Sequence, residues 1–463
     1  MTKIKKLPQD LKNVLDNPAS KKALKPGFRT VYIGHGLSNL EEGNLVPIWL
    51  PNKALSSHCL IGGAIGSGKT MMTMRLIAGA LKNYGTIVIG EAKGGQNGSA
   101  EGAAFTDLGQ YLSKQLGYPV YRWPRGNCWF NPLFYLREAK ERKAFFETLC
   151  NQMQSSTGIS GDMLGFLYNA ANIAELILEF LGRFSTKGNI KKTCTLRSLV
   201  KYLQRPDRLQ QDINTFLTDG KEYLKTLRGE DYQKCAMDLE LLEDIQYRLM
   251  LCNFFFLDKP EFAMTRHGVN IFVSLLNHRD LLDYSEFHPN LPELKIDDIL
   301  YDRSLVIISQ PLSDPSSKMV GPLFWDALLT RILELGPNPK ARNRKPREAV
   351  LAILDETHRL LVGRLGESGD FLREYNVGLV EILPTIGDKQ RWEANQHVYQ
   401  TIISLSPGVQ EVVELIRSRL PNLPLPPGYW DIGANNQPIA RLNTNHAYRM
   451  GDDNQGFLLV HCA

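Results

Sequence analysis

One eight-residue segment constrains this chain more than any other. Gly63-Ala64-Ile65-Gly66-Ser67-Gly68-Lys69-Thr70 fits the pattern GxxxxGK[ST], and the sequence predicts a buried strand before it (58–61) and a helix after it (70–83). In this pattern, glycines let backbone N–H groups turn inward around phosphate oxygens. The lysine reaches the β- and γ-phosphates, and the last hydroxyl ligates Mg²⁺. All eight residues are therefore predicted to bind a nucleotide; the alternative is a glycine turn that binds nothing.

Two adjacent acids end another apolar strand-like run, at Asp355 and Glu356. In P-loop enzymes an Asp in this place completes the magnesium site, so Thr70 and Asp355 are the predicted metal ligands. Glu356 is placed to activate the attacking water as general base. The alternative is a strand that merely ends in solvated acids. Glu91 ends a further strand and would face the same crevice, because parallel strands end at one edge; an ordinary β-to-α turn is equally compatible with it.

The order of apolar runs predicts the fold class. Short buried runs separated by helices indicate parallel βαβ units, here over 86–89, 119–121, 304–309, 350–354, 378–383 and 401–405. Helical stretches near 139–153, 164–184, 196–203 and 232–257 interrupt this pattern. We expect an α/β protein, a RecA-like P-loop NTPase with a mostly parallel sheet and an inserted all-α domain.

Charge and cysteine content give weaker indications. With 54 basic and 49 acidic residues, the net charge of +5 does not by itself identify a nucleic-acid binder. Basic residues gather in the first thirty positions and in a run from Lys340 to Arg347. The first thirty residues could lie on anionic lipid or nucleic acid, and the run from Lys340 to Arg347 could reach a nucleic-acid phosphate backbone; each could also simply be solvated. Seven scattered cysteines without a CxxC pair favour a reducing cytoplasm. No apolar stretch approaches the roughly 20 residues of a membrane span.

Six segments, in order, resemble the type IV coupling proteins of conjugation and type IV secretion, within the FtsK–HerA branch of ring-forming P-loop ATPases. The resemblance runs from about residue 30 to residue 407. The segments are the P-loop with its strand, residues 86–94 ending in Glu-Ala-Lys-Gly, Asn131-Pro132-Leu133, residues 305–311, the strand with Asp355 and Glu356, and residues 373–378.

This resemblance implies a function. Such a protein forms a ring, a hexamer, that hydrolyses ATP with Mg²⁺ and moves DNA or hands a DNA–protein substrate to a secretion channel. DNA, further copies of the chain, a relaxase and channel proteins are the implied partners. Arg373 matches the family's arginine, which would reach a neighbouring subunit's site and act with Lys69 and Glu356. The implied location is cytoplasmic, with peripheral contact at the inner face of the membrane.

The chain departs from the family in three respects. Family members usually carry N-terminal transmembrane helices, and none is predicted here. The family's Asp-Pro-Lys-Gly reads Glu-Ala-Lys-Gly, and its Gln motif is replaced by residues 382–385, with Gln390 the next glutamine. Two rival functions follow: a soluble HerA-like DNA translocase in repair or plasmid maintenance, and a non-motor ATP-binding scaffold.

The expected domain organisation has five segments. They are a basic N-terminal segment (1–45), a first part of the P-loop motor domain (46–135), the inserted all-α domain (136–262), a second part of the motor domain (263–430) and a C-terminal β-hairpin segment (431–463).

Overall fold

The computed structural model describes most of the central chain. The described residues are 30–38, 45–51, 58–63, 69–81, 85–92, 104–136, 138–157, 161–184, 194–310, 319–336, 349–356, 360, 364–365, 369–384, 392–393, 396–399, 401–405, 411–412, 414–415, 446–450 and 457–461.

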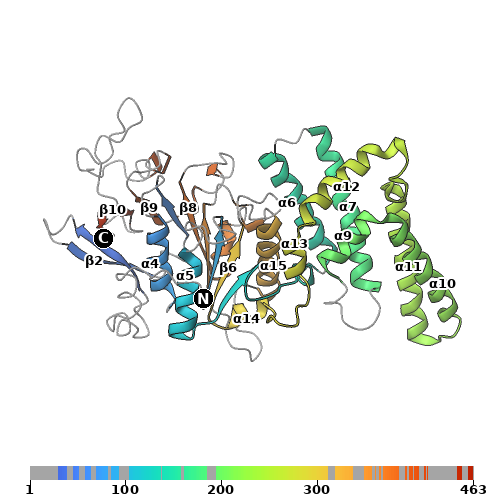
Figure 1. Ribbon diagram of the computed structural model, residues 1–463, viewed down its shortest axis with the longest axis horizontal. Coiled ribbons are helices and arrows are strands. Elements are labelled where there is room, and N and C mark those ends of the chain that lie inside the picture. The colour runs from blue at the N-terminus through green and yellow to red at the C-terminus, as the bar shows by residue number, and fades with distance from the viewer. Residues whose placement is uncertain are drawn as a thin grey trace.

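An eleven-stranded sheet forms one half of the structure (Figure 1), with the order β2-β1-β11-β10-β9-β3-β8-β7-β4-β6-β5. The strands are β1 (Thr30–Ser38), β2 (Leu45–Pro51), β3 (Cys59–Gly62), β4 (Thr86–Glu91), β5 (Val120–Trp123), β6 (Ser304–Ser309), β7 (Val350–Asp355), β8 (Val377–Leu383), β9 (Thr401–Leu405), β10 (His446–Met450) and β11 (Phe457–His461). The seven neighbours from β9 to β5 pair in parallel. β10, β11, β1 and β2 extend the sheet antiparallel. The predicted α/β class with a mostly parallel sheet is confirmed.

The parallel strands are apolar throughout because helices cover both faces of the sheet. Every residue of β4, β6, β7 and β8 is buried. Alternate residues enter two cores, so that Ile87 and Ile89 pack with α4 (Lys69–Ala80) and α5 (Ala104–Leu116). Val88 packs on the opposite face with α15 (Val320–Leu335). The alternation therefore also determines on which face of the sheet the last side chain of each strand lies.

The inserted helical domain lies between β5 and β6, which are neighbours in the sheet. Its elements, with the helices that lead back to β6, are η1 (Pro132–Phe134), α6 (Ala139–Thr157), α7 (Gly161–Phe184), α9 (Leu196–Gln204), α10 (Pro206–Leu224), α11 (Gly229–Leu251), α12 (Ala263–Leu276), α13 (Arg279–Tyr284) and α14 (Ile296–Tyr301). α6, α9, α11 and α12 all contact α7, and α10 pairs with α11 at the far end (Figure 1). The all-α insert is confirmed, and the predicted domain boundaries stay predictions.

One helix of this domain is long and apolar enough to cross a membrane by length and composition. The segment Met163–Phe184 has a mean hydropathy of 1.3, and 61% of its most apolar window is buried inside the structure. Ile173 and Ile177 are fully buried against the surrounding helices. The apolar character of α7 is thus accounted for by its place at the centre of the helical domain.

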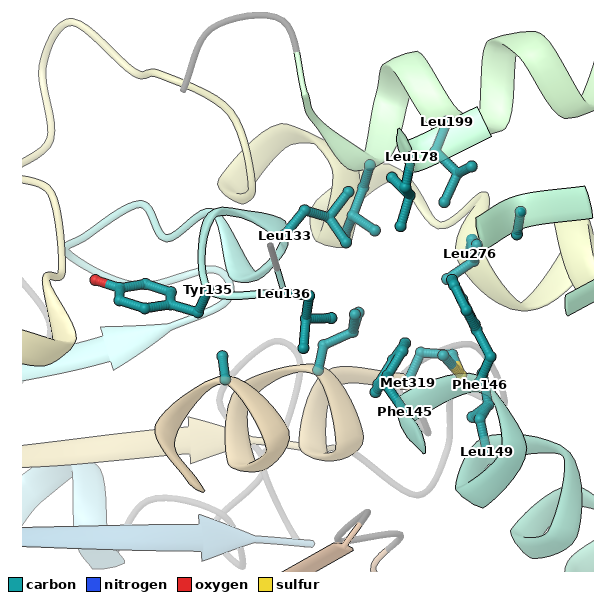
Figure 2. Close-up of a cluster of buried hydrophobic side chains, with 14 of the residues drawn as sticks. Leu133, Tyr135, Leu136, Phe145, Phe146, Leu149, Leu178, Leu199, Leu276 and Met319 are labelled. Carbon is teal, nitrogen blue, oxygen red and sulfur yellow. The ribbon is translucent and has the colours of Figure 1, made fainter. Parts of the chain in front are cut away.

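A shared apolar cluster joins the helical domain to the sheet. Figure 2 shows side chains from the η1 region, α6, α7, α9 and α12 gathered near Met319, the residue before α15. The labelled members are Leu133, Leu136, Phe145, Phe146, Leu149, Leu178, Leu199, Leu276 and Met319, whereas the ring of Tyr135 points away from them. Because α15 also covers the sheet, this helix lies between the two parts of the molecule.

Candidate functional site

The functional residues gather where the parallel strands end. Glu91 pairs with Ser309 of β6 on one side and with Asp355 of β7 on the other. Asp355 pairs in turn with Ile382 of β8, which pairs with Ile61 of β3. Directly paired residues therefore run across the sheet from Ser309 of β6 to Ile61 of β3, the strand that enters the P-loop. β8 lies between the P-loop strand and the Asp355 strand.

Both acids of this row point to the face of the sheet that carries the P-loop helix. Side chains alternate along a strand, so Glu91 shares its face with Ile87 and Ile89, and Asp355 shares its face with Ile353. Those isoleucines pack with α4 and α5. Glu91 and Asp355 are each only 2% exposed. The edge thus holds two buried acidic residues on adjacent strands, whose backbones lie about 5 Å apart in the pairing direction.

Lys69 begins α4 and is buried, with 7% of its surface exposed. Its Nζ donates a hydrogen bond of 2.7 Å to the carbonyl oxygen of Gly63, so the ammonium lies at the start of the loop. The amide of Gly63 donates to the carbonyl of Leu383 at the end of β8, 3.1 Å away. Thr70, next on α4, is half-buried. The amino end of a helix favours anions, and this one carries a lysine and a hydroxyl.

The remaining P-loop residues, Ala64, Ile65, Gly66, Ser67 and Gly68, lie outside the described residues, and their predicted contacts with phosphate stay predictions. The basic run at 340–347, most of the basic N-terminal segment and Gln390 also lie outside the described residues, and what was predicted for them stays a prediction.

Glu356 follows Asp355 in an unusual backbone conformation. Its φ is +55° and its side chain is 7% exposed. A left-handed conformation in a residue other than glycine costs on the order of 1–3 kcal/mol and persists where the surroundings hold it. Beyond Glu356 the described chain reaches the opposite face, because Leu360 and Leu365 belong to the core around α15. Asp355 and Leu360 therefore lie on opposite faces of the sheet.

Arg373 is not brought together with these residues. It is exposed and precedes β8, in a turn closed by a hydrogen bond from the amide of Asn376 to its carbonyl. Asn376 also accepts from the amide of Val350, at the beginning of β7. Arg373 thus lies at the amino edge of the sheet, roughly 20 Å by strand length from the edge with Gly63 and Asp355. It cannot reach the P-loop of its own subunit.

Two residues at the carboxyl edge were missed in the sequence. Ser309 ends β6 beside Glu91 and is 6% exposed. A guanidinium nitrogen of Arg122, on the edge strand β5, donates to its Oγ at 3.4 Å. The position of Ser309 at the end of an apolar strand could have indicated in the sequence that it lies at this edge. Arg122 becomes visible only once β5 is known to lie next to β6.

The donor set is compatible with a metal held jointly by protein and nucleotide. Within the described ranges, no three His, Cys, Asp or Glu side chains are grouped closely enough to hold a metal ion. Thr70 and Asp355 supply a hydroxyl and a carboxylate, which suit Mg²⁺. This ion usually keeps water and substrate phosphates as its other ligands. The residues present therefore fit Mg²⁺ bound with a nucleotide.

Comparisons with known proteins place the fold. No family model matches the chain, and no curated protein matches it in sequence. The plasmid coupling protein TrwB in complex with the non-hydrolysable GTP analogue GDPNP has a TM-score of 0.55 and 15% identity, over 90% of this chain and 88% of that one. TrwB with ADP and Mg²⁺ gives 0.53 and 16%, over 93% of each chain. TrwB with the ATP analogue ADPNP gives 0.53 and 16%, over 94% and 95%. At these identities the likeness concerns the fold, and it spans nearly the whole of both chains.

Proposed function

We propose that this chain is a Mg²⁺-dependent ATPase of the type IV coupling kind, which moves DNA or a DNA–protein substrate toward a conjugation or type IV secretion channel. The observation that carries the proposal is the common edge. The P-loop strand, Lys69 and the buried Asp355 meet there, in a fold shared with TrwB over at least 90% of this chain. The TrwB structures are of a coupling protein bound to nucleotides, which supports ATP and Mg²⁺ as ligands.

In this proposal the P-loop binds the nucleotide, and Asp355 and Glu356 take part in its hydrolysis. The backbone of residues 64–68 would surround the phosphates, and Lys69 would exchange the Gly63 carbonyl for a phosphate oxygen. Thr70 and Asp355 would hold Mg²⁺, which neutralises charge on the transferred phosphoryl group. Glu356 would orient the attacking water and accept its proton. Arg373 would act at the site of a neighbouring subunit, in the hexameric ring that the resemblance to coupling proteins implies.

The remaining proposals concern partners and place in the cell. DNA, a relaxase and secretion-channel proteins are the proposed partners. The proposed location is the cytoplasm, with the basic segment 1–45 in peripheral contact with the inner face of the membrane.

A non-motor scaffold is the second candidate, because α10 and α11 expose large apolar side chains. Tyr223 and Tyr247 are each 60% exposed, and Leu251 is 63% exposed. Such residues on a protruding helix pair offer a surface to a protein partner. A scaffold would bind ATP without turnover that depends on DNA.

The deciding experiment measures ATP hydrolysis by the purified full chain with and without DNA, beside Lys69→Ala. We expect DNA to stimulate hydrolysis in the wild type and the variant to be inactive, because Lys69 supplies charge to the phosphates. Circular dichroism checks that the variant is folded. Turnover near the wild-type rate in folded Lys69→Ala would refute the site. Hydrolysis that ignores DNA would favour the scaffold.

A further inference from the structure

An ion pair between a buried aspartate and the half-buried Arg364 ties Arg364 to α15. Asp326 lies in the middle of α15 and is fully buried. The backbone amide of Arg364 donates to its Oδ1 at 2.7 Å, and Nε of Arg364 donates to its Oδ2 at 3.3 Å. A terminal guanidinium nitrogen donates to Oγ1 of Thr330, one turn further along α15, at 2.6 Å. Arg364 is thus held at both its backbone and its side chain.

The same segment is anchored by apolar contacts. Leu360 and Leu365 are 4% and 3% exposed and belong to the core around α15. Leu360 also lies over β4. Its Cδ1 and the ring of Trp325 of α15 fill the space beside Gly90, where a Cβ atom would lie 3.3 Å from the first and 3.4 Å from the second. Arg364 and the two leucines therefore attach residues 360, 364 and 365 to one helix and one strand.

The backbone of Glu356 is the feature that such contacts can support. Its left-handed backbone is costly in isolation and needs surroundings that hold it. We propose that Asp326 and Arg364 are positioning residues for Glu356: by holding the following segment on α15, they keep the Glu356 carboxylate at the carboxyl edge of the sheet. This inference rests on the proposed function, in which Glu356 is the general base.

The place of the pair gives it a further consequence. α15 contacts η1 and α6, and its beginning at Met319 lies in the cluster that joins the helical domain to the sheet (Figure 2). α15 therefore carries both the Asp326–Arg364 pair and the contact with the helical domain.

Two substitutions test the positioning role. Asp326→Asn keeps the shape of the side chain but removes the charge that Arg364 meets, and Thr330→Val removes only one hydrogen bond. A displacement of about 1 Å at a catalytic group can cost roughly 100-fold in rate, so we expect kcat to fall about 10- to 100-fold in Asp326→Asn. Thr330→Val should lose a smaller factor. Nucleotide affinity, measured by titration with a fluorescent ATP analogue, should stay at the wild-type value in both.

Arg331→Ala is the matched control. Arg331 lies on the same helix and also pairs with acids, Asp297 and Glu334. Its loss should leave kcat unchanged. A folded Asp326→Asn with wild-type kcat, or a loss explained by weaker nucleotide binding, would overturn the inference.

Because removing one partner of a buried ion pair is strongly destabilising, Asp326→Asn can fail to fold. Thr330→Val then decides the matter: a lower kcat at unchanged affinity supports the inference, and a wild-type kcat overturns it. If the wild type shows no hydrolysis that depends on Lys69, the proposed function fails instead.

Discussion

Glu91 and Asp355 are directly paired residues at the ends of neighbouring parallel strands, and both are almost fully buried. Burying negative charge is costly unless a cation or hydrogen-bond donors offset it. The arrangement is therefore suited to a divalent ion at this edge, with Asp355 as the proposed ligand and Glu91 as a second source of negative charge.

Glu91→Gln tests that contribution. Removing one negative charge should raise the Mg²⁺ concentration needed for half-maximal ATPase activity several-fold. ATP without Mg²⁺ should bind more tightly, because the triphosphate meets less repulsion. A Mg²⁺ titration of the ATPase rate measures the first effect. Ser309→Ala is the control, since Ser309 is the neutral neighbour of Glu91 in the same row. Equal shifts in both variants would contradict a charge effect.

Glu356→Gln should separate binding from turnover. The amide keeps the shape of the side chain but cannot accept a proton, and general-base catalysis typically contributes roughly 10²–10⁴-fold. We expect nucleotide to bind normally and turnover to fall by about this factor in single-turnover measurements. Glu374→Gln is the control, because Glu374 is exposed at the amino edge. A fully active Glu356→Gln would place the general base elsewhere.

The elements around the site could be predicted because parallel strands covered on both faces are continuous apolar runs. β6 and β9 begin and end where the sequence predicts them. α10 was missed, since only Leu209, Ile213 and Leu217 of its residues are buried. Pro206 and Asp207 at its first turn were the signals available for it.

The relationships between elements were not predictable from local pattern. The contact of Asp326 with Arg364 depends on how α15 lies on the sheet, and the pairing of Glu91 with Ser309 depends on strand order. The position of Arg373 could be predicted in part from the sequence. A residue before a parallel strand lies at the edge opposite the P-loop, which already separates it from the site of its own subunit.

Cysteine reactivity tests the packing of the helical domain. Burial raises the pKa of the Cys150 thiol to about 12 and that of Cys194 to about 11, whereas Cys235 is half-buried on α11. At pH 8 a thiol of pKa 12 is ionised in roughly one molecule in 10⁴, and the thiolate is the reactive form. Iodoacetamide should therefore modify Cys235 in the native protein, and Cys150 and Cys194 only after unfolding. Peptide mass mapping distinguishes the sites; rapid native labelling of Cys150 would mean that the surrounding cluster opens.

The position of Arg373 gives the sharpest test of a ring. The short helix α16 (Gly369–Leu372) precedes it, and His58 holds this helix. The amide of Leu379 donates to Nδ1 of His58, so Nε2 carries the proton and donates to the carbonyl of Gly369 at 2.7 Å. Arg373 is thus presented from a fixed turn at the amino edge of the sheet, away from the P-loop of its own subunit.

Two inactive variants, mixed together, test this action between subunits. Arg373→Ala keeps the P-loop but offers no arginine, and Lys69→Ala does the reverse. An arginine supplied by a neighbour is typically worth roughly 10³–10⁵ in rate, so each variant alone should be nearly inactive. In mixed rings some sites combine an intact Lys69 with a neighbour's Arg373, and part of the ATPase activity should return. The control mixes Lys69→Ala with a variant that carries both Lys69→Ala and Arg373→Ala. No intact P-loop is then present, so no activity should return. Mixed rings without activity would exclude action in trans, and an active Arg373→Ala alone would remove this residue from the site.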